Sequence, residues 1–452
     1  MANPQSLTYY APAGKPMAGG RFLYPHAVLD LIAAAPENSW IQLNTNTFQE
    51  AWSPADSRWI SGNNSAEGPD AIMRSWASIG WDSKRSRAVL WGGGHANSWA
   101  NEVYTWSAYT RKWAHAFYCT DMLTAIGRPV DGNNSPVSSH TYANNFYLPI
   151  LDRFFTGGGA NQPGGTTMSV WDGNTTVGYA GGFTLDLALA GQGFVGGLTG
   201  SNCKHGSLSG HDFPGARAWK LRNFCDGRLA VLPSTVNPSK IESGVAHAVE
   251  NGHDVLYMVI LSCVFRVEFV DDDPDNDVIT QVAGYDPSRY TNGAVAYDPL
   301  RKLFVMPTGD TTSRRLNFID LKKVPNLSAA WPYVVSYPSE LALGYLGSNG
   351  HHKYCGFAYY PAGECFVYWY KGRQPWLIHP PEGNPTPSTG WTLTRPTMDA
   401  GTSAPPEIET DAMGVCGKFR YAEDLGCCIA IRGDYAGNVW ALKLAGWTDP
   451  RS

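Results

Sequence analysis

The sequence predicts an all-β protein: a closed β-propeller ring of six or seven four-stranded blades. The main observation is a repeated unit, in which an aromatic residue, a polar turn and an apolar strand follow one another along the chain. A single antiparallel sheet of this kind cannot bury both of its faces alone, so it requires neighbours built in the same way. Arranging those sheets radially leaves few exposed sheet edges, which a flat array would not.

Composition is the second observation. The 452 residues include 17 Trp, 23 Tyr, 17 Phe and 49 Gly, and only 16% are charged. This balance favours tight turns and aromatic-packed sheets over long helices or disorder. The net charge of -5 comes without any basic run, so nucleic acid is not an expected partner.

The compartment is predicted from the N-terminus, the apolar runs and the cysteines. Residues 1–5 lack the basic and apolar regions of a signal peptide. The longest nearly apolar run, 255–270, contains Arg266 and Glu268 and predicts buried strands, with no membrane insertion. Nine cysteines without a Cys-x-x-Cys pair indicate free thiols in a reducing cytosol; four of them stand in strand-like runs, namely Cys263, Cys355, Cys365 and Cys428.

The best-preserved unit spans Trp81–Trp113. A polar turn leads to the strand 88–91, then to three glycines, a second strand at 102–106, another turn and Trp113. Five further units carry the first half of this pattern, although the one that begins at Glu250 lacks the aromatic. They are Tyr147–Thr156, Glu250–Val259, Tyr297–Met306, Tyr360–Tyr370 and Tyr421–Ile431.

The second halves of the units are less regular. Strands matching 103–106 are expected at 168–172, 316–321 and 438–444. The pattern is poor over 185–243, which predicts either a degenerate seventh unit or an inserted loop. The units recur roughly every 45 to 65 residues, close to the spacing of about 50 in kelch blades.

Domain organisation follows from this periodicity. Residues 1–38 are expected to form an N-terminal extension, with a helical segment at 28–35, and residues 39–452 the propeller. The strand at 40–43 and the last strand, 439–444, are predicted to meet in one blade and close the ring.

The residues around Gly92 resemble a kelch repeat, which has a glycine doublet, an aromatic residue and a Trp seven positions further on. Here these are Gly92-Gly93, Trp106 and Trp113. The strings WGGGHANSWANEVYTW, SSHTYANNFYLPILDRFFTGGG and GKFRYAEDLGCCIAIRGDYAGNVWALKL are similar to kelch-like propellers of bacteria and their phages. This resemblance implies the fold over roughly 70–446, and it leaves function open because most of that group has no assigned activity.

Several histidines lie near the expected starts or corners of inner strands, where distant residues can converge at one mouth of the central channel. They are His95, His140, His247, His351 and His352. Such a group could build a metal or sugar site. The alternative is that each histidine caps a loop or bonds a neighbouring blade. The pairs have no local metal-ligand spacing, so no metal or other cofactor is expected.

Other chemistry has weaker support. The copper radical oxidases of the galactose oxidase kind share the general fold, but Tyr354, Cys355, Tyr359 and Cys365 do not map residue by residue onto their crosslink. The alternating aspartates of 271–277 could surround Ca²⁺, but a solvated turn is the preferred interpretation. A nucleophile elbow and a phosphate loop are both missing.

Aromatic side chains on glycine-rich loops are candidates for stacking on sugar rings, with packing on neighbouring loops as the alternative. They are Trp52, Trp59, Trp99 and Trp376. Among these, Trp99 and Trp376 join His95, His140, His247 and His351 as the expected binding residues.

The expected function is a non-catalytic structural or binding propeller. The phage-side resemblance implies a virion component of the tail or particle surface, made in the host cytoplasm and oligomeric within an assembly. Its expected partners are other virion proteins or host glycans. The alternative is a carbohydrate-active enzyme or a lectin, with a site at the channel mouth built from His140, His247 and His351.

Overall fold

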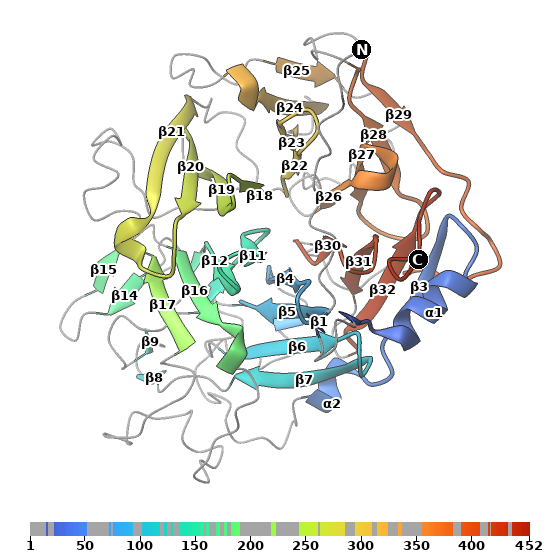
Figure 1. The fold of residues 1–452 in the computed structure, drawn as a ribbon, viewed down its shortest axis with the longest axis horizontal. Helices are drawn as coiled ribbons and strands as arrows, with labels where there is room; N and C mark the ends of the chain where they lie inside the picture. Colours follow the sequence, from blue (N-terminus) through green and yellow to red (C-terminus); the bar gives the residue numbers. More distant parts are fainter. Residues whose placement is uncertain are drawn as a thin grey trace.

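The computed structural model confirms a propeller, with six four-stranded antiparallel sheets arranged as blades around one axis (Figure 1). The structure describes residues 15–16, 22–51, 72–73, 76–93, 102–117, 122–123, 128–129, 136, 138–157, 160–161, 169–171, 176–178, 182–189, 218–222, 244–260, 263–284, 294–309, 314–323, 333–336, 355–382, 390–406, 415, 417–432 and 436–452.

The first three blades follow one another along the chain. Blade 1 contains β4 (Ser78–Asp82), β5 (Arg87–Trp91), β6 (Val103–Ser107) and β7 (Lys112–Phe117). Blade 2 contains β11 (Asn145–Leu148), β12 (Arg153–Thr156), β16 (Gly182–Asp186) and β17 (Trp219–Arg222). Blade 3 contains β18 (Val245–Glu250), β19 (His253–Ile260), β20 (Cys263–Phe269) and β21 (Val278–Gly284).

The last three blades complete the ring. Blade 4 contains β22 (Ala296–Asp298), β23 (Leu303–Gly309), β24 (Arg314–Asp320) and β25 (Tyr333–Ser336). Blade 5 contains β26 (Gly356–Tyr360), β27 (Cys365–Trp369), β28 (Trp376–His379) and β29 (Thr392–Thr394). Blade 6 contains β30 (Phe419–Ala422), β31 (Cys427–Arg432), β32 (Asn438–Lys443) and β3 (Ser39–Gln42).

Short elements lie outside the blades. Two-stranded sheets pair β1 (Lys15–Pro16) with β2 (Phe22–Leu23), β8 (Met122–Leu123) with β9 (Arg128–Pro129), β10 (Ser139–His140) with β13 (Ala160–Asn161), and β14 (Ser169–Trp171) with β15 (Thr176–Gly178). The helices are α1 (His26–Ala34) and α2 (Phe48–Ala51), with single 3₁₀ turns η1 (Leu187–Leu189), η3 (Pro274–Asn276), η5 (Leu321–Lys323) and η7 (Pro361–Gly363). No helix in the described part of the chain is long and apolar enough to cross a membrane.

The first strand of each blade lies nearest the axis, and these inner strands contact one another around the ring (Figure 1). The strands β4 and β11 approach each other closely. A Cβ atom at Gly80 would stand 2.8 Å from the backbone carbon of Phe146, so this position excludes a side chain. Gly92 and Gly93, at the end of β5, have φ of 126° and 99° and turn the chain where other residues would be strained.

The core consists of one hydrophobic cluster at each junction between neighbouring blades. The cluster between blades 6 and 1 contains Trp81 and Ile429, and the one between blades 5 and 6 contains Val367 and Trp440. The other four junctions are filled in the same way. Each sheet therefore buries both of its faces, which explains why the inner strands carry so few polar side chains.

The predicted closure of the ring is confirmed. β3 pairs antiparallel with β32, with Ser39 opposite Lys443 and Gln42 opposite Trp440. The expected helical segment is present as α1, and its Val28, Leu29 and Ile32 side chains pack into the cluster between blades 6 and 1. The N-terminal segment thus contributes both a strand and a helix to the same junction.

Each of the six units found in the sequence spans the end of the first strand, the turn and the second strand of one blade, and the described residues form six blades. One strand prediction was wrong. Residues 169–171 form β14 in a separate two-stranded sheet, and β16 is the third strand of blade 2. The poorly patterned region 185–243 holds β17, the outer strand of the same blade, and no described part of it forms a seventh sheet.

The closing strand generates a stability prediction. Trp40 is 1% exposed, packs against the Trp369 ring at 4.8 Å, and its Nε1 donates to Arg373 O at 2.8 Å. Trp40→Ala should lower the free energy of unfolding by about 3–5 kcal/mol, measured by chemical denaturation. Gln42→Ala, at an exposed position of the same strand, should cost much less. Equal losses in the two variants would contradict this account of closure.

Candidate functional site at the turn face

The turns between the first and second strands of the blades lie together at one end of the ring, which we call the turn face. Five of these turns have four residues, and in each the fourth residue has a positive φ. These residues are Ser86, Asp152, Lys302, Glu364 and Gly426, with φ of 48°, 58°, 54°, 46° and 66°. Blade 3 instead has the two-residue turn Asn251-Gly252.

An aromatic residue stands one position before the last residue of the inner strand in those same five blades. The residues are Trp81, Tyr147, Tyr297, Tyr359 and Tyr421. Each packs into the cluster shared with the preceding blade. The aromatic residue that begins a unit of the sequence pattern therefore fixes its blade against the previous one in blades 1, 2, 4 and 6. In blade 5 the predicted unit begins one residue later, at Tyr360, which packs against blade 6 instead.

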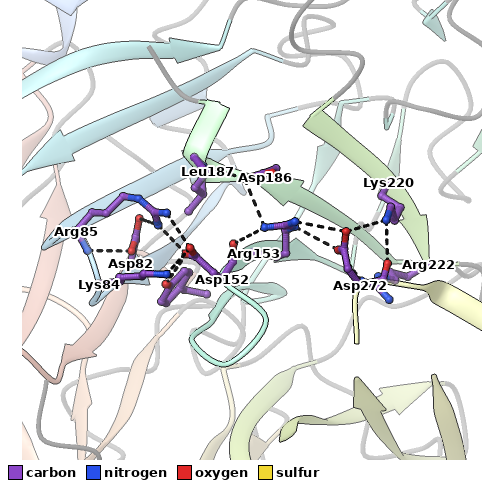
Figure 2. A network of polar contacts seen from close by, with 12 residues as sticks. Asp82, Lys84, Arg85, Asp152, Arg153, Asp186, Leu187, Lys220, Arg222 and Asp272 are labelled. Carbon is purple, nitrogen blue, oxygen red and sulfur yellow. Dashed lines mark hydrogen bonds and ion pairs between the residues drawn. The ribbon is translucent and has the colours of Figure 1, made fainter. Parts of the chain in front are cut away.

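Asp152 forms the polar connection between blades 1 and 2 (Figure 2). Its carboxylate accepts hydrogen bonds from Lys84 Nζ at 2.6 Å, from Arg85 Nη1 and Nη2 at 2.8 and 2.9 Å, and from Tyr147 Oη at 2.8 Å. Burial alone would raise the pKa of Asp152, but bonds from these three donors outweigh it and lower the pKa to about 2. Arg85 also reaches Asp82 at 3.1 Å, so one guanidinium joins two carboxylates.

Asp272 forms a second centre, between blades 2 and 3 (Figure 2). It pairs with Arg153, Lys220 and Arg222 at 3.2, 2.8 and 3.3 Å. Arg222 is fully buried and also pairs with the buried Asp277 at 3.1 Å. The aspartate-rich segment is therefore a turn held by cations of the neighbouring blade. Among the residues that the structure describes, no group of three His, Cys, Asp or Glu side chains is placed to hold a metal ion.

Asp254 and Asp424 connect further junctions. The fully buried Asp254 accepts hydrogen bonds from the backbone N–H groups of Ile150 and Leu151 in the neighbouring turn, and lies 2.8 Å from His247 Nε2. Asp424 accepts a hydrogen bond from Trp81 Nε1 at 2.5 Å across the junction between blades 6 and 1. Burial raises the pKa of Asp424 to about 7 despite bonds from Ser86 and Trp81 that favour the carboxylate.

Arg420 occupies the inner strand of blade 6. It donates to the backbone carbonyls of Ile79, Ala143 and Asn145, and its guanidinium lies 4.3 Å from the centre of the Phe146 ring. Burial lowers the pKa of Arg420 to about 9. This side chain links blade 6 to blades 1 and 2 near the axis.

The residues expected to form a site lie in different environments. His140 belongs to β10, beside the starts of the inner strands at the end opposite the turn face, and its ring lies 4.2 Å from that of Trp76. His247 lies in β18 and bonds Asp254 toward the turn face. These two histidines therefore have different bonding partners. His95, Trp99, His351, His352 and Tyr354, like Trp52 and Trp59, fall outside the described residues.

Trp376 requires a correction, because it lies in β28 and not on an exposed loop. It is 5% exposed, belongs to the cluster between blades 4 and 5, and the Arg395 guanidinium covers its ring at 4.3 Å.

The thiols of Cys355 and Cys365 are free and buried, and burial raises the pKa of each to about 12. They are therefore protonated core groups at neutral pH.

The aspartates at the junctions were not expected from the sequence. Asp152, Asp254 and Asp424 bond partners on neighbouring blades, and nothing local indicates those partners. One feature of the sequence could have pointed to two of these aspartates. Asp152 and Asp424 lie in four-residue turns that come soon after an aromatic residue, and such turns recur between the first two strands of the blades.

Comparisons with known proteins add little to this description. No family model matches the chain, and no curated protein matches it. Among solved structures, the chain is similar to an exo-β-1,3-galactanase from Phanerochaete chrysosporium, determined with β-1,3-galactotriose. The TM-score is 0.32 and the identity 10%, over 89% of this chain and 70% of the other. The fold therefore rests on the observed sheets.

The two cations that reach Asp152 allow a matched test. Arg85→Met should lower the free energy of unfolding by about 1–3 kcal/mol, because it leaves the buried carboxylate of Asp82 and the partly buried carboxylate of Asp152 without their shared donor. Lys84→Met removes a side chain that is 52% exposed and should cost about 0–1 kcal/mol. Chemical denaturation measures both. Similar costs would show that Arg85 is no more than a surface ion pair.

Asp424 predicts a dependence of stability on pH. Because its pKa is raised in the folded protein, its contribution is complete below the unfolded pKa and is lost as pH rises through about 7. Asp424→Asn should therefore flatten the fall in unfolding free energy between about pH 5 and about pH 8. Asp449→Asn is the control, since the bonds from Arg451 lower the pKa of Asp449. An unchanged slope in Asp424→Asn would refute the assignment.

Proposed function

We propose that this protein is a non-catalytic propeller that binds other macromolecules. The observation that carries the proposal is that charged groups at the turn face bond neighbouring blades. The carboxylates of Asp152, Asp254 and Asp272 bond donor groups on neighbouring blades. Catalytic carboxylates need access to a substrate, whereas these groups hold the ring rigid. A rigid ring suits the display of loops to a partner.

The setting that we propose is a bacteriophage particle, in the tail or on the surface. The support is the resemblance of the strings around Gly92, Tyr147 and Tyr421 to kelch-like propellers of bacteria and their phages. In that setting the propeller contacts other virion proteins or host glycans as one of several copies. Its inter-blade bonds would keep the displayed loops in place outside the cell.

The particle setting is tested by composition. Particles of the phage that encodes the chain, purified by density gradient, should contain it in a fixed ratio to the capsid protein, as measured by quantitative mass spectrometry. A soluble protein of the infected cell should fall away over successive gradients. Loss of this chain in parallel with such soluble proteins would overturn the virion proposal.

The absence of catalysis is tested separately on the purified chain. We expect no reducing-sugar release from a polysaccharide panel, and no stoichiometric metal by elemental analysis. His247→Ala provides the control, because any activity that depends on the His247–Asp254 pair should disappear in it. Sugar release by the original chain but not by the variant would establish a carbohydrate-active enzyme instead.

A further inference from the structure

Four large aliphatic side chains are exposed at the turn-face end of blades 2 and 3. They are Ile150, Val249, Val270 and Val278, with exposed fractions of 38%, 40%, 40% and 46%. They are the exposed large hydrophobic residues among those that the structure describes. Water contact at such side chains is unfavourable, so neighbouring members of this set indicate a surface that a partner covers.

The strand register places the three valines at one end of blade 3 but on two faces of its sheet. Val249 pairs with Asp254 and Asp254 with Phe269, so Val249 lies on the face that packs against blade 2. Val278 pairs with Glu268 of β20, and Glu268 with Val255, so Val278 lies on the face that packs against blade 4. Ile150 N donates to the carboxylate of the same Asp254. Neighbouring strands lie about 4.8 Å apart, so the strand ends that carry the three valines span roughly 15 Å. Val270 and Val278 stand at the two sides of the connection between β20 and β21.

The connection between Val270 and Val278, residues 271–277, carries negative charge. Asp272 and Asp277 point to the cations of blade 2, while Asp271, Asp273 and Asp275 are exposed. Hydrogen bonds within the connection hold the side chains of Asp271 and Asp273. Asp271 accepts from Asp273 N at 2.7 Å and from Asn276 Nδ2 at 2.9 Å, and Asp273 accepts from Asp275 N at 3.0 Å. Little conformational freedom is therefore lost when a partner binds.

We propose that Val270, Val278 and the exposed aspartates between them form a docking surface for a partner protein segment that carries both basic and aliphatic side chains. The valines would bury against the aliphatic side chains, and Asp271, Asp273 and Asp275 would face the cations. This inference rests on the proposed binding function and names the chemistry of the partner, but it does not require a phage particle.

Other occupants fit the surface less well. Nucleic acid and anionic lipid carry the same sign of charge as the aspartates. Sugar rings are bound by aromatic faces, and the exposed hydrophobic groups here are aliphatic. A second copy of the chain that docked with this same surface would oppose aspartates to aspartates. A protein segment with basic and aliphatic side chains complements both the aspartates and the valines of this surface.

The experiment measures binding of fluorescein-labelled synthetic peptides to the full chain by fluorescence anisotropy. One peptide alternates lysine with valine, a second alternates lysine with serine, and a third alternates glutamate with valine. We expect the lysine–valine peptide to bind at least about tenfold more tightly than either of the others, because it alone satisfies both kinds of contact.

Two double variants separate the contributions. Val270→Ser with Val278→Ser should weaken binding of the lysine–valine peptide about tenfold and leave its salt dependence unchanged. Asp271→Asn with Asp275→Asn should weaken binding similarly and reduce the salt dependence. Glu50→Gln with Glu382→Gln, which neutralises two exposed carboxylates elsewhere, should bind as the original chain does. All these side chains are exposed, and matching thermal unfolding would show that the variants are folded.

The inference is overturned if the lysine–valine peptide binds no more tightly than the lysine–serine peptide, or if either test variant binds as the original chain does. Stronger binding of the glutamate–valine peptide would overturn it too. These results would leave the particle proposal standing, since that depends on the composition of virions. Conversely, absence from virions would remove the particle setting and leave this docking surface intact.

Discussion

The structure depends on the burial of both faces of every sheet between two neighbours. A four-stranded sheet with apolar side chains on both faces is unstable alone, and a row of such sheets would leave two outer faces in water. Closing the row into a ring removes both. The pairing of β3 with β32 makes that closure, because it completes blade 6 with a strand from the opposite end of the chain.

The polar groups follow from the same constraint. Apolar packing holds neighbouring blades together without fixing their relative height or rotation, since the hydrophobic effect has no direction. Directed bonds at the turn face supply that precision. Three aspartates each accept a hydrogen bond from a neighbouring blade. They are Asp152 between blades 1 and 2, Asp254 between blades 2 and 3, and Asp424 between blades 6 and 1. Arg420 does the same near the axis through backbone carbonyls.

The sequence predicted the architecture well because the repeated signals are local. In five of the six blades an aromatic residue, a four-residue turn and an apolar strand lie within a dozen positions, so the pattern is visible without knowing which blades are neighbours. The third strand of blade 2 was misplaced because Ser169–Trp171 has the same alternation as Val103–Trp106, and alternation does not say which sheet a strand joins. The polar contacts could not be predicted for a related reason. Lys84 and Asp152 are 68 positions apart, and only the assembled ring brings them together.

The closing strand also sets the timing of folding during synthesis. Gln42 in β3 hydrogen-bonds Asn438, the first residue of β32, and 396 positions separate them. At ribosomal rates of about 5–20 residues per second, β3 emerges about 20 to 80 s before the partner that it pairs with. During that interval a nascent chain has an unpaired strand at one end and an incomplete last blade at the other. Two nascent chains on one messenger can therefore exchange these strands, so a ring made from a single chain forms only when that chain pairs its own N-terminal strand before a neighbouring chain does.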